Sequence, residues 1–182
     1  MADNMVLGVF RNVNDADIAM SRLRDKGFSN DDISVVTSEE VRRGSVNLND
    51  DPMTEDVKGG AKTGGLVGAV LGFLTGIGAI TIPGIGALLI AGPIAAALGL
   101  TGVAATTVTG ALTGALAGGL IGALKDLGID ELTAKNIEDT VKNGGVLLGV
   151  DVMDSEQEEE VKDVMEASNV DKTTVVQLKD DR

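Results

Sequence analysis

Glycines are the first residues in this sequence whose type and spacing could do chemistry. The segment GGLVGAVLGFLTG contains Gly64, Gly65, Gly68 and Gly72, and glycine-rich loops can cradle a phosphate group. A phosphate loop requires the pattern GxxxxGK(S/T), and no lysine follows these glycines. A dinucleotide-binding loop requires a strand directly before it and an acidic residue about twenty residues later, and neither is present. The pattern therefore indicates helix packing rather than a cofactor site.

Acidic and hydroxyl side chains form the other candidate sites. The acidic runs Asp50–Asp56 and Asp154–Glu160 could bind calcium, but neither has the central glycine and terminal glutamate of an EF-hand loop. A solvated protein surface explains both runs better. Four threonines could line a polar path, although such hydroxyls more commonly bond to the carbonyl group four residues earlier. These are Thr106, Thr107, Thr109 and Thr113.

The chain lacks the residue types on which many catalytic and metal sites depend. Its 182 residues include no His and no Cys, which excludes imidazole acid–base catalysis, thiol nucleophiles and zinc sites. There is no Trp or Tyr to stack on a base, and the net charge of −13 disfavours contact with phosphate backbones. We therefore predict no catalytic residue, no cofactor, no metal ion and no nucleic-acid partner.

Residues 63–124, between Lys62 and Lys125, contain no charged side chain, and we call them the uncharged segment. Glycines recur here at every fourth residue, a step that places them on one face of an α-helix. Each glycine costs a helix about 0.5–1 kcal/mol relative to alanine, so a row of them indicates close packing against another backbone. The two predicted packing rows are Gly60, Gly64, Gly68, Gly72 and Gly76, and Gly110, Gly114, Gly118 and Gly122.

These two rows predict a helical hairpin with one helix over Gly60–Ile80 and the other over Val103–Leu124. Pro83 and Pro93 interrupt the interval between them, which should be a loop with a short helix. Ordinary helix pairs lie about 8–10 Å apart, and the glycine faces should pack at or below the low end of that range. Glycines facing open solvent, or strands within the segment, would contradict this expectation.

The two ends of the chain share one pattern. Leu7-Gly8-Val9 matches Leu148-Gly149-Val150, and a helix and a second strand follow each match. Two such units predict an α+β fold, a split βαβ ferredoxin-like sandwich with the long glycine-zipper α-helical hairpin inserted between its halves. The expected strands are Met5–Phe10, Ile33–Thr37, Val146–Val152 and Thr174–Leu178. The expected helices run from Asn14 or Asp15 to Lys26 and from Asp154 or Ser155 to Ala167.

These elements divide the chain into four parts. Residues 1–37 form the first βαβ half, and residues 38–58 form a flexible acidic linker without apolar periodicity. Residues 59–125 form the glycine-zipper hydrophobic insert. Residues 126–182 contain a connecting helix over Asp130–Lys142 and the second βαβ half.

Three stretches of the chain carry a resemblance to a known family. They are VLGVFRNVNDADIAMSRLRDKGFSNDDISVVT, the glycine-rich stretch with IPGIGALLIAGP, and LGIDELTAKNIEDTVKNGGVLLGVDV. Together they resemble the bacterial general stress proteins, whose members are described as heat-, salt- or cold-induced. The resemblance implies a stress-linked role and brings no enzyme activity or catalytic residue with it.

Two coverings for the uncharged segment remain open. The 62 residues of the uncharged segment, if exposed to water, would form a larger apolar patch than soluble monomers tolerate, so either lipid or further copies of the chain should cover them. We expect a non-enzymatic, self-associating protein in the cytoplasm, with or without attachment to the cytoplasmic membrane. The alternative is a regulatory module that binds a small ligand on its ferredoxin-like domain. A metal-free hydrolase built on Ser, Thr and acidic residues is a third option.

Overall fold

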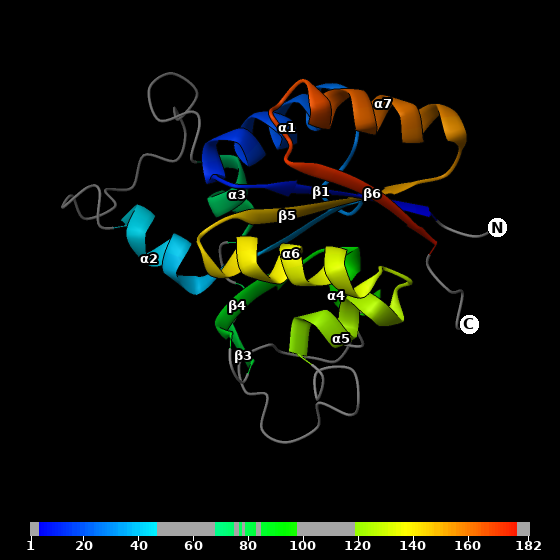
Figure 1. The fold of residues 1–182 in the computed structure, drawn as a ribbon. Helices are drawn as coiled ribbons and strands as arrows, with labels where there is room; N and C mark the ends of the chain where they lie inside the picture. Colours follow the sequence, from blue (N-terminus) through cyan, green and yellow to red (C-terminus); the bar gives the residue numbers. More distant parts are fainter. Residues whose placement is uncertain are drawn as a thin grey trace.

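The computed structural model describes residues 4–46, 68–74, 77, 79–82, 85–97 and 119–177. In this part of the chain six strands form one antiparallel sheet in the order β3-β4-β2-β5-β1-β6, and helices cover both of its faces (Figure 1). The mixed α and β architecture that the sequence predicts is confirmed.

Four of the strands are those expected from the two ends of the chain. They are β1 (Asn4–Phe10), β2 (Ile33–Ser38), β5 (Val146–Val152) and β6 (Lys172–Gln177). The repeated Leu-Gly pairs face each other across β1 and β5, with Leu7 opposite Gly149 and Gly8 opposite Leu148. A Cβ atom on Gly8 would lie 2.5 Å from the Met165 sulfur atom, so the bare glycine makes room for a helix side chain that packs on the sheet.

One face of the sheet carries α1 (Val13–Asp25), α7 (Ser155–Glu166) and the short α3 (Gly68–Phe73). The α1 cap lies earlier than predicted, because the Asn12 side chain accepts a hydrogen bond from the Asp15 amide at 2.9 Å. The α7 cap is Asp154, one of the two predicted residues, and it accepts from the Gln157 amide at 2.8 Å. Both caps satisfy donors that the first helical turn leaves free.

The other face carries α6 (Glu131–Lys142), α5 (Gly119–Asp126) and α4 (Pro93–Ala97) (Figure 1). Because successive side chains of a strand point to opposite faces, each strand contributes to two cores. On β1, Val6 and Phe10 join the core beneath α1 and α7, whereas Leu7 and Val9 join the core beneath α6. The sheet is therefore buried on both sides, and burial of both faces stabilises it.

The structure differs from the prediction over residues 79–91, where the end of the first helix and then a loop with a short helix were expected. Here β3 (Ala79–Ile82) and β4 (Gly86–Ala91) form a strand hairpin, and β4 extends the sheet by pairing with β2. The predicted helix Gly60–Ile80 is represented by α3, which ends at Phe73. Leu88 and Ile90 are buried on one face while Leu89 and Ala91 are buried on the other. An apolar segment next to the unpaired edge of β2 satisfies that edge best as a strand.

Part of the predicted linker is also helical, because Glu39–Val46 form α2. The Glu39 carboxylate pairs with Arg42 at 3.1 Å and with Arg43 at 2.9 Å, one helical turn away. Arg42 also donates to the Ile77 carbonyl group at 3.1 Å. Charge pairs at this spacing support a helix that lacks an apolar stripe. Residues 47–58 of the linker lie outside the described residues.

Candidate functional site

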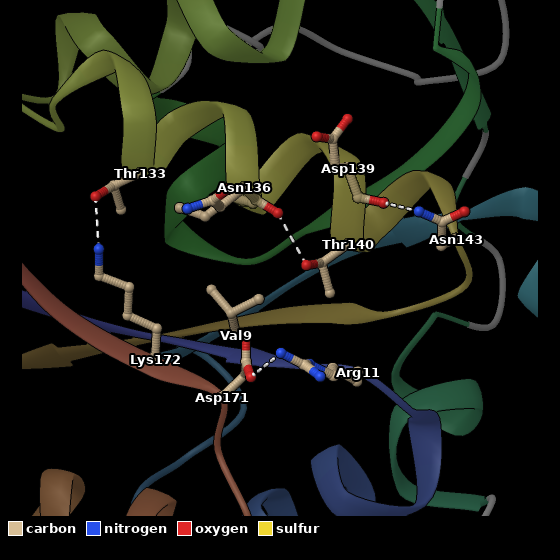
Figure 2. Close-up of a pocket in the computed structure, with 10 residues that line it drawn as sticks. Val9, Arg11, Thr133, Asn136, Asp139, Thr140, Asn143, Asp171 and Lys172 are labelled. Atoms are coloured by element: carbon tan, nitrogen blue, oxygen red, sulfur yellow. Dashed lines mark hydrogen bonds and ion pairs between the residues drawn. The ribbon is translucent and has the colours of Figure 1, made fainter.

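A polar groove of about 480 Å³ lies between α6 and the neighbouring ends of β1 and β6 (Figure 2). Its floor is apolar, since Val9 of β1 and Ile137 of α6 are both buried. Its walls are polar and come from segments far apart in the sequence. The lining residues are Val9, Arg11, Thr133, Asn136, Ile137, Asp139, Thr140, Asn143, Asp171 and Lys172.

The α6 wall presents uncharged hydroxyl and amide groups. Thr133, Asn136, Thr140 and Asn143 follow one another at steps of three and four residues, which places them on one side of the helix. The Thr140 hydroxyl donates to the Asn136 carbonyl oxygen at 2.8 Å, and the Asn143 amide donates to the Asp139 carbonyl oxygen at 2.7 Å. Both side chains keep acceptor oxygens for a further partner.

The strand wall carries the charges of the groove. Arg11 follows β1 and pairs with Asp171, which precedes β6, at 2.6 Å. The Asp171 amide donates to the Val9 carbonyl oxygen at 2.8 Å and so holds the start of β6 against β1. Lys172 reaches across the groove and donates to the Thr133 hydroxyl at 2.7 Å (Figure 2). The two walls are therefore joined at one end by a single side-chain contact.

The N-cap of α6 completes this end of the groove. Asp130 accepts a hydrogen bond from the Thr133 amide at 2.9 Å. Hydrogen bonds from the Thr133 side chain and amide, with the positive charge of Lys172, hold the pKa of Asp130 below its ordinary value. The arrangement can bind a polar ligand, because it offers donors and acceptors above an apolar floor. Among the residues that the structure describes, no cluster of three acidic side chains could hold a metal ion.

Comparison with known proteins identifies the first part of the chain. Residues 5–82 match the family model of the heat induced stress protein YflT domain. We call residues 5–82, which are similar to that domain, the stress protein domain. The match confirms the resemblance to bacterial general stress proteins, and it spans β1 to β3 of the sheet. Neither the curated proteins nor the solved structures provided a match to the chain.

The stress protein domain contains two of the predicted packing glycines in described positions, Gly68 and Gly72 on α3. Both are exposed, and a Cβ atom added to either would have no neighbour within 4 Å. They do not pack against another helix within the described ranges, and most of the predicted partner helix Val103–Leu124 lies outside those ranges, so the contact within a hairpin stays a prediction. Gly122 is half-buried on α5. The other predicted glycines lie outside the described residues, namely Gly60, Gly64, Gly76, Gly110, Gly114 and Gly118.

The uncharged segment was also considered as a membrane-spanning element. No helix within the described ranges is both long enough and apolar enough to cross a bilayer. The stretch 98–118, which contains most of the second predicted helix, lies outside those ranges.

The stress protein domain also has a buried charge that sequence reasoning missed. Asp17 on α1 is fully buried and accepts a hydrogen bond from the Val70 amide of α3 at 2.7 Å. Burial raises the pKa of Asp17 to about 6, although the Val70 hydrogen bond and the charge of Arg24 oppose the rise. The available signal was the position of Asp17 beside the apolar stripe of α1, next to Ala16 and three residues before Met20.

The groove residues on α6 were missed as well. Thr133, Asn136, Thr140 and Asn143 keep a helical spacing that a search for polar stripes could have found. The prediction of the connecting helix rested on its apolar positions instead, which are Leu132, Ile137 and Val141. Of these, Leu132 is 71% exposed, whereas Ile137 and Val141 are buried as expected.

Proposed function

We propose that this stress-associated protein is not an enzyme and that it assembles with further copies of itself through the uncharged segment. The observation that carries the proposal is the separation of charge along the chain. All 28 acidic and 15 basic residues lie outside residues 63–124. The rest of the chain provides the charged, solvated surface that keeps such an assembly in solution.

The exposed face of α3 supports the same proposal. Gly68 and Gly72 present bare backbone at the surface, while Val70 and Leu74 anchor the helix in the core beneath α1. A bare face allows another backbone to approach closely, which is the physical basis of glycine-mediated packing. This is the face on which a second copy of the chain would pack.

Substitution of the two exposed glycines by lysine tests self-association. The native protein should form a particle larger than the 18.6 kDa monomer in light scattering coupled to gel filtration. The double variant Gly68→Lys and Gly72→Lys should shift the particle towards the monomer, because two charges and two long side chains then stand on the packing face. The fold should survive, since a Cβ atom added at either glycine would have no neighbour within 4 Å among the described residues.

A matched control adds the same two charges elsewhere. Leu132 and Met153 are exposed apolar residues outside the uncharged segment, so Leu132→Lys with Met153→Lys should leave the particle size unchanged. A native protein that is monomeric in solution and floats with phosphatidylglycerol vesicles would replace self-association by membrane attachment. A native protein that is monomeric and does not bind the vesicles would refute both self-association and membrane attachment.

We also propose that the two ends of the chain form one ferredoxin-like unit. The neighbouring strands β2-β5-β1-β6, with α1 and α7 on one face, have the order that two joined βαβ halves would produce. The pairing of Leu7 with Gly149 and of Gly8 with Leu148 supports a twofold relation between the halves. Nuclear Overhauser contacts between β1 and β5 test this register, and a different strand neighbour for β1 would contradict it.

Ligand binding is a second candidate function, and the groove between α6 and the strand ends favours it. The groove has the size of ordinary small-molecule sites, about 300–1,000 Å³, and combines an apolar floor with a few polar groups. A thermal-shift panel of metabolites tests it: a rise in the melting temperature with one chemical class would support a regulatory module, and a flat panel would count against it.

A further inference from the structure

We infer that the groove between α6 and the ends of β1 and β6 binds a small polyhydroxylated anion, such as a sugar acid or a sugar phosphate. This inference rests on the second candidate function and adds to it the chemical class of the ligand. It depends on the charges of the strand wall, on the uncharged row of the helix wall and on the nature of the floor.

The strand wall carries two cations and one carboxylate, and the Asp130 carboxylate at the N-cap of α6 also lies within the field of Lys172. Arg11 and Lys172 face the groove, and Asp171 is the carboxylate paired with Arg11. The carboxylate of Asp139 points to the side of α6 away from both cations (Figure 2). The guanidinium of Arg11 has five N–H donors and the ammonium of Lys172 has three, so each keeps donors after its internal contact. Free donors on two cations select an anionic oxygen group, which forms the stronger charge-assisted hydrogen bonds.

The helix wall provides a row of partners for hydroxyl groups. A sugar hydroxyl both donates and accepts, and amide and hydroxyl side chains match that requirement. Asn136 is exposed, and its side-chain amide makes no hydrogen bond with the described residues. Thr140 and Asn143 follow it along the same wall, at spacings of about 5–6 Å between Cβ atoms. A chain of neighbouring hydroxyls can follow such a row.

The floor of the groove is aliphatic and offers no aromatic partner on which a flat ligand could stack. Val9 and Ile137 form the floor, and no aromatic side chain lines the groove. Stacking on an aromatic ring is the usual way to hold a nucleobase, and it is not available here. A volume of about 480 Å³ holds one small molecule. The groove therefore fits a compact polyol that carries one acidic group.

A purely structural role would explain only part of this arrangement. The contact of Lys172 with buried Thr133 fastens β6 to α6, and the Arg11–Asp171 pair fastens the strand ends. Asn136 makes no such contact, and the Arg11 side chain is 76% exposed. Ion pairs this exposed add little to stability. Ligand binding explains the placement of Asn136 and Arg11, whereas a role in holding the strands and the helix together does not.

Titration of the ¹⁵N-labelled full chain with five probes tests the inference. Gluconate and glucose 6-phosphate should shift the amide resonances of α6 and of residues 171–172. Glucose lacks the anionic group and should shift them weakly, and glucosamine, a cation, should not shift them.

A response to gluconate alone identifies a carboxylate ligand, and a response to glucose 6-phosphate alone identifies a phosphate ester. Inorganic phosphate should bind more weakly than either. Groove shifts with glucose or glucosamine but not with the anions would refute the ligand class and leave the binding module standing. No groove shift with any probe would refute both.

Two variants with matched controls locate the site. Lys172→Gln should weaken binding of the responding anion about tenfold or more, because it removes a charge-assisted hydrogen bond. Lys135→Gln removes an equal charge from an exposed position of α6 that does not line the groove, and it should leave binding unchanged. Asn136→Ala should weaken binding without lowering the melting temperature, which a structural role would not produce, and Leu132→Ala serves as its control. Equal weakening by Lys172→Gln and Lys135→Gln would show only a general charge effect and would overturn the site.

Discussion

Replacement of Asp17 with asparagine should raise the free energy of unfolding at pH 8 by about 1–3 kcal/mol. The carboxylate is fully buried, and its Oδ2 atom has no hydrogen-bond partner among the described residues. Asparagine keeps an acceptor for the Val70 amide while removing the buried charge. The pKa shift of Asp17 from 3.8 to about 6 sets the upper bound of this gain in the free energy of unfolding, at about 3 kcal/mol.

The same substitution should remove a dependence of stability on pH. Because the folded pKa of Asp17 lies above its unfolded value, folding takes up a proton between these values. The stability from protonated Asp17 is fully present below about pH 3.8 and is lost as the pH rises through about 6. Arg24, also on α1, is the charged group that opposes this shift through its field. The native protein should therefore lose stability between pH 5 and pH 8, and the asparagine variant should lose less.

Urea unfolding followed by circular dichroism measures both effects, because the chain has no Trp or Tyr for fluorescence. Asp25→Asn is the matched control, since it removes an exposed carboxylate from the same helix and should change stability by only about 0.5 kcal/mol. An Asp17→Asn protein that is less stable at pH 8 than the native protein would show that the charge stabilises α3 more than burial penalises it.

Replacement of Gly92 with alanine should destabilise the protein by about 2–5 kcal/mol. Gly92 joins β4 to α4 and has φ of +85°, a conformation that costs an alanine about 1–2 kcal/mol. A Cβ atom there would collide with the Ile33 carbonyl oxygen and lie 2.7 Å from the Ser34 Cα atom. Both neighbours are backbone atoms of β2, so either the strand or α4 must move, at a further cost of about 1–3 kcal/mol.

Gly86→Ala is the matched control for this prediction. Gly86 is the first residue of β4 and has φ of +104°, and an added Cβ atom would have no neighbour within 4 Å among the described residues. It should therefore cost only the strain of about 1–2 kcal/mol. Urea unfolding of the two variants gives the difference. Equal costs would mean that β4 and α4 do not pack closely on β2, and the hydrogen bond from the Ile94 amide to the Ser34 hydroxyl would then also be in doubt.

The sequence alone was sufficient to locate the elements at both ends of the chain. Met5–Phe10 and Val146–Val152 were predicted as strands, and these residues pair with each other in the sheet. Their success has a local cause, since short aliphatic runs between turn residues favour strands and the adjacent helices carry one apolar side and a polar cap. The repeat of the Leu-Gly pair also indicated two related halves. The absence of His and Cys by itself excluded the classes of catalytic site that need an imidazole or a thiol.

The uncharged segment shows where local reasoning failed. Without charged residues a segment has no polar face, so its periodicity cannot separate a helix from a strand buried on both sides. The glycine spacing favoured a helix up to Ile80, and the two prolines favoured a loop with a short helix after it. Instead, Ala79–Ile82 form β3 and Gly86–Ala91 form β4. The segment forms strands because the backbone groups at the edge of β2 need hydrogen-bond partners. That edge exists only once the sheet is assembled.

The candidate site and the buried charge depended on tertiary structure in the same way. Arg11 and Lys172 are 161 residues apart in the sequence, and they line one groove because β6 pairs with β1. Asp17 became a buried acceptor because α3 packs on α1 and places the Val70 amide against it. The sequence by itself determined the local elements, the separation of charge and the lack of common catalytic side chains. Only the folded sheet decided which polar groups meet, because pairing of distant strands brings together residues that no local pattern connects.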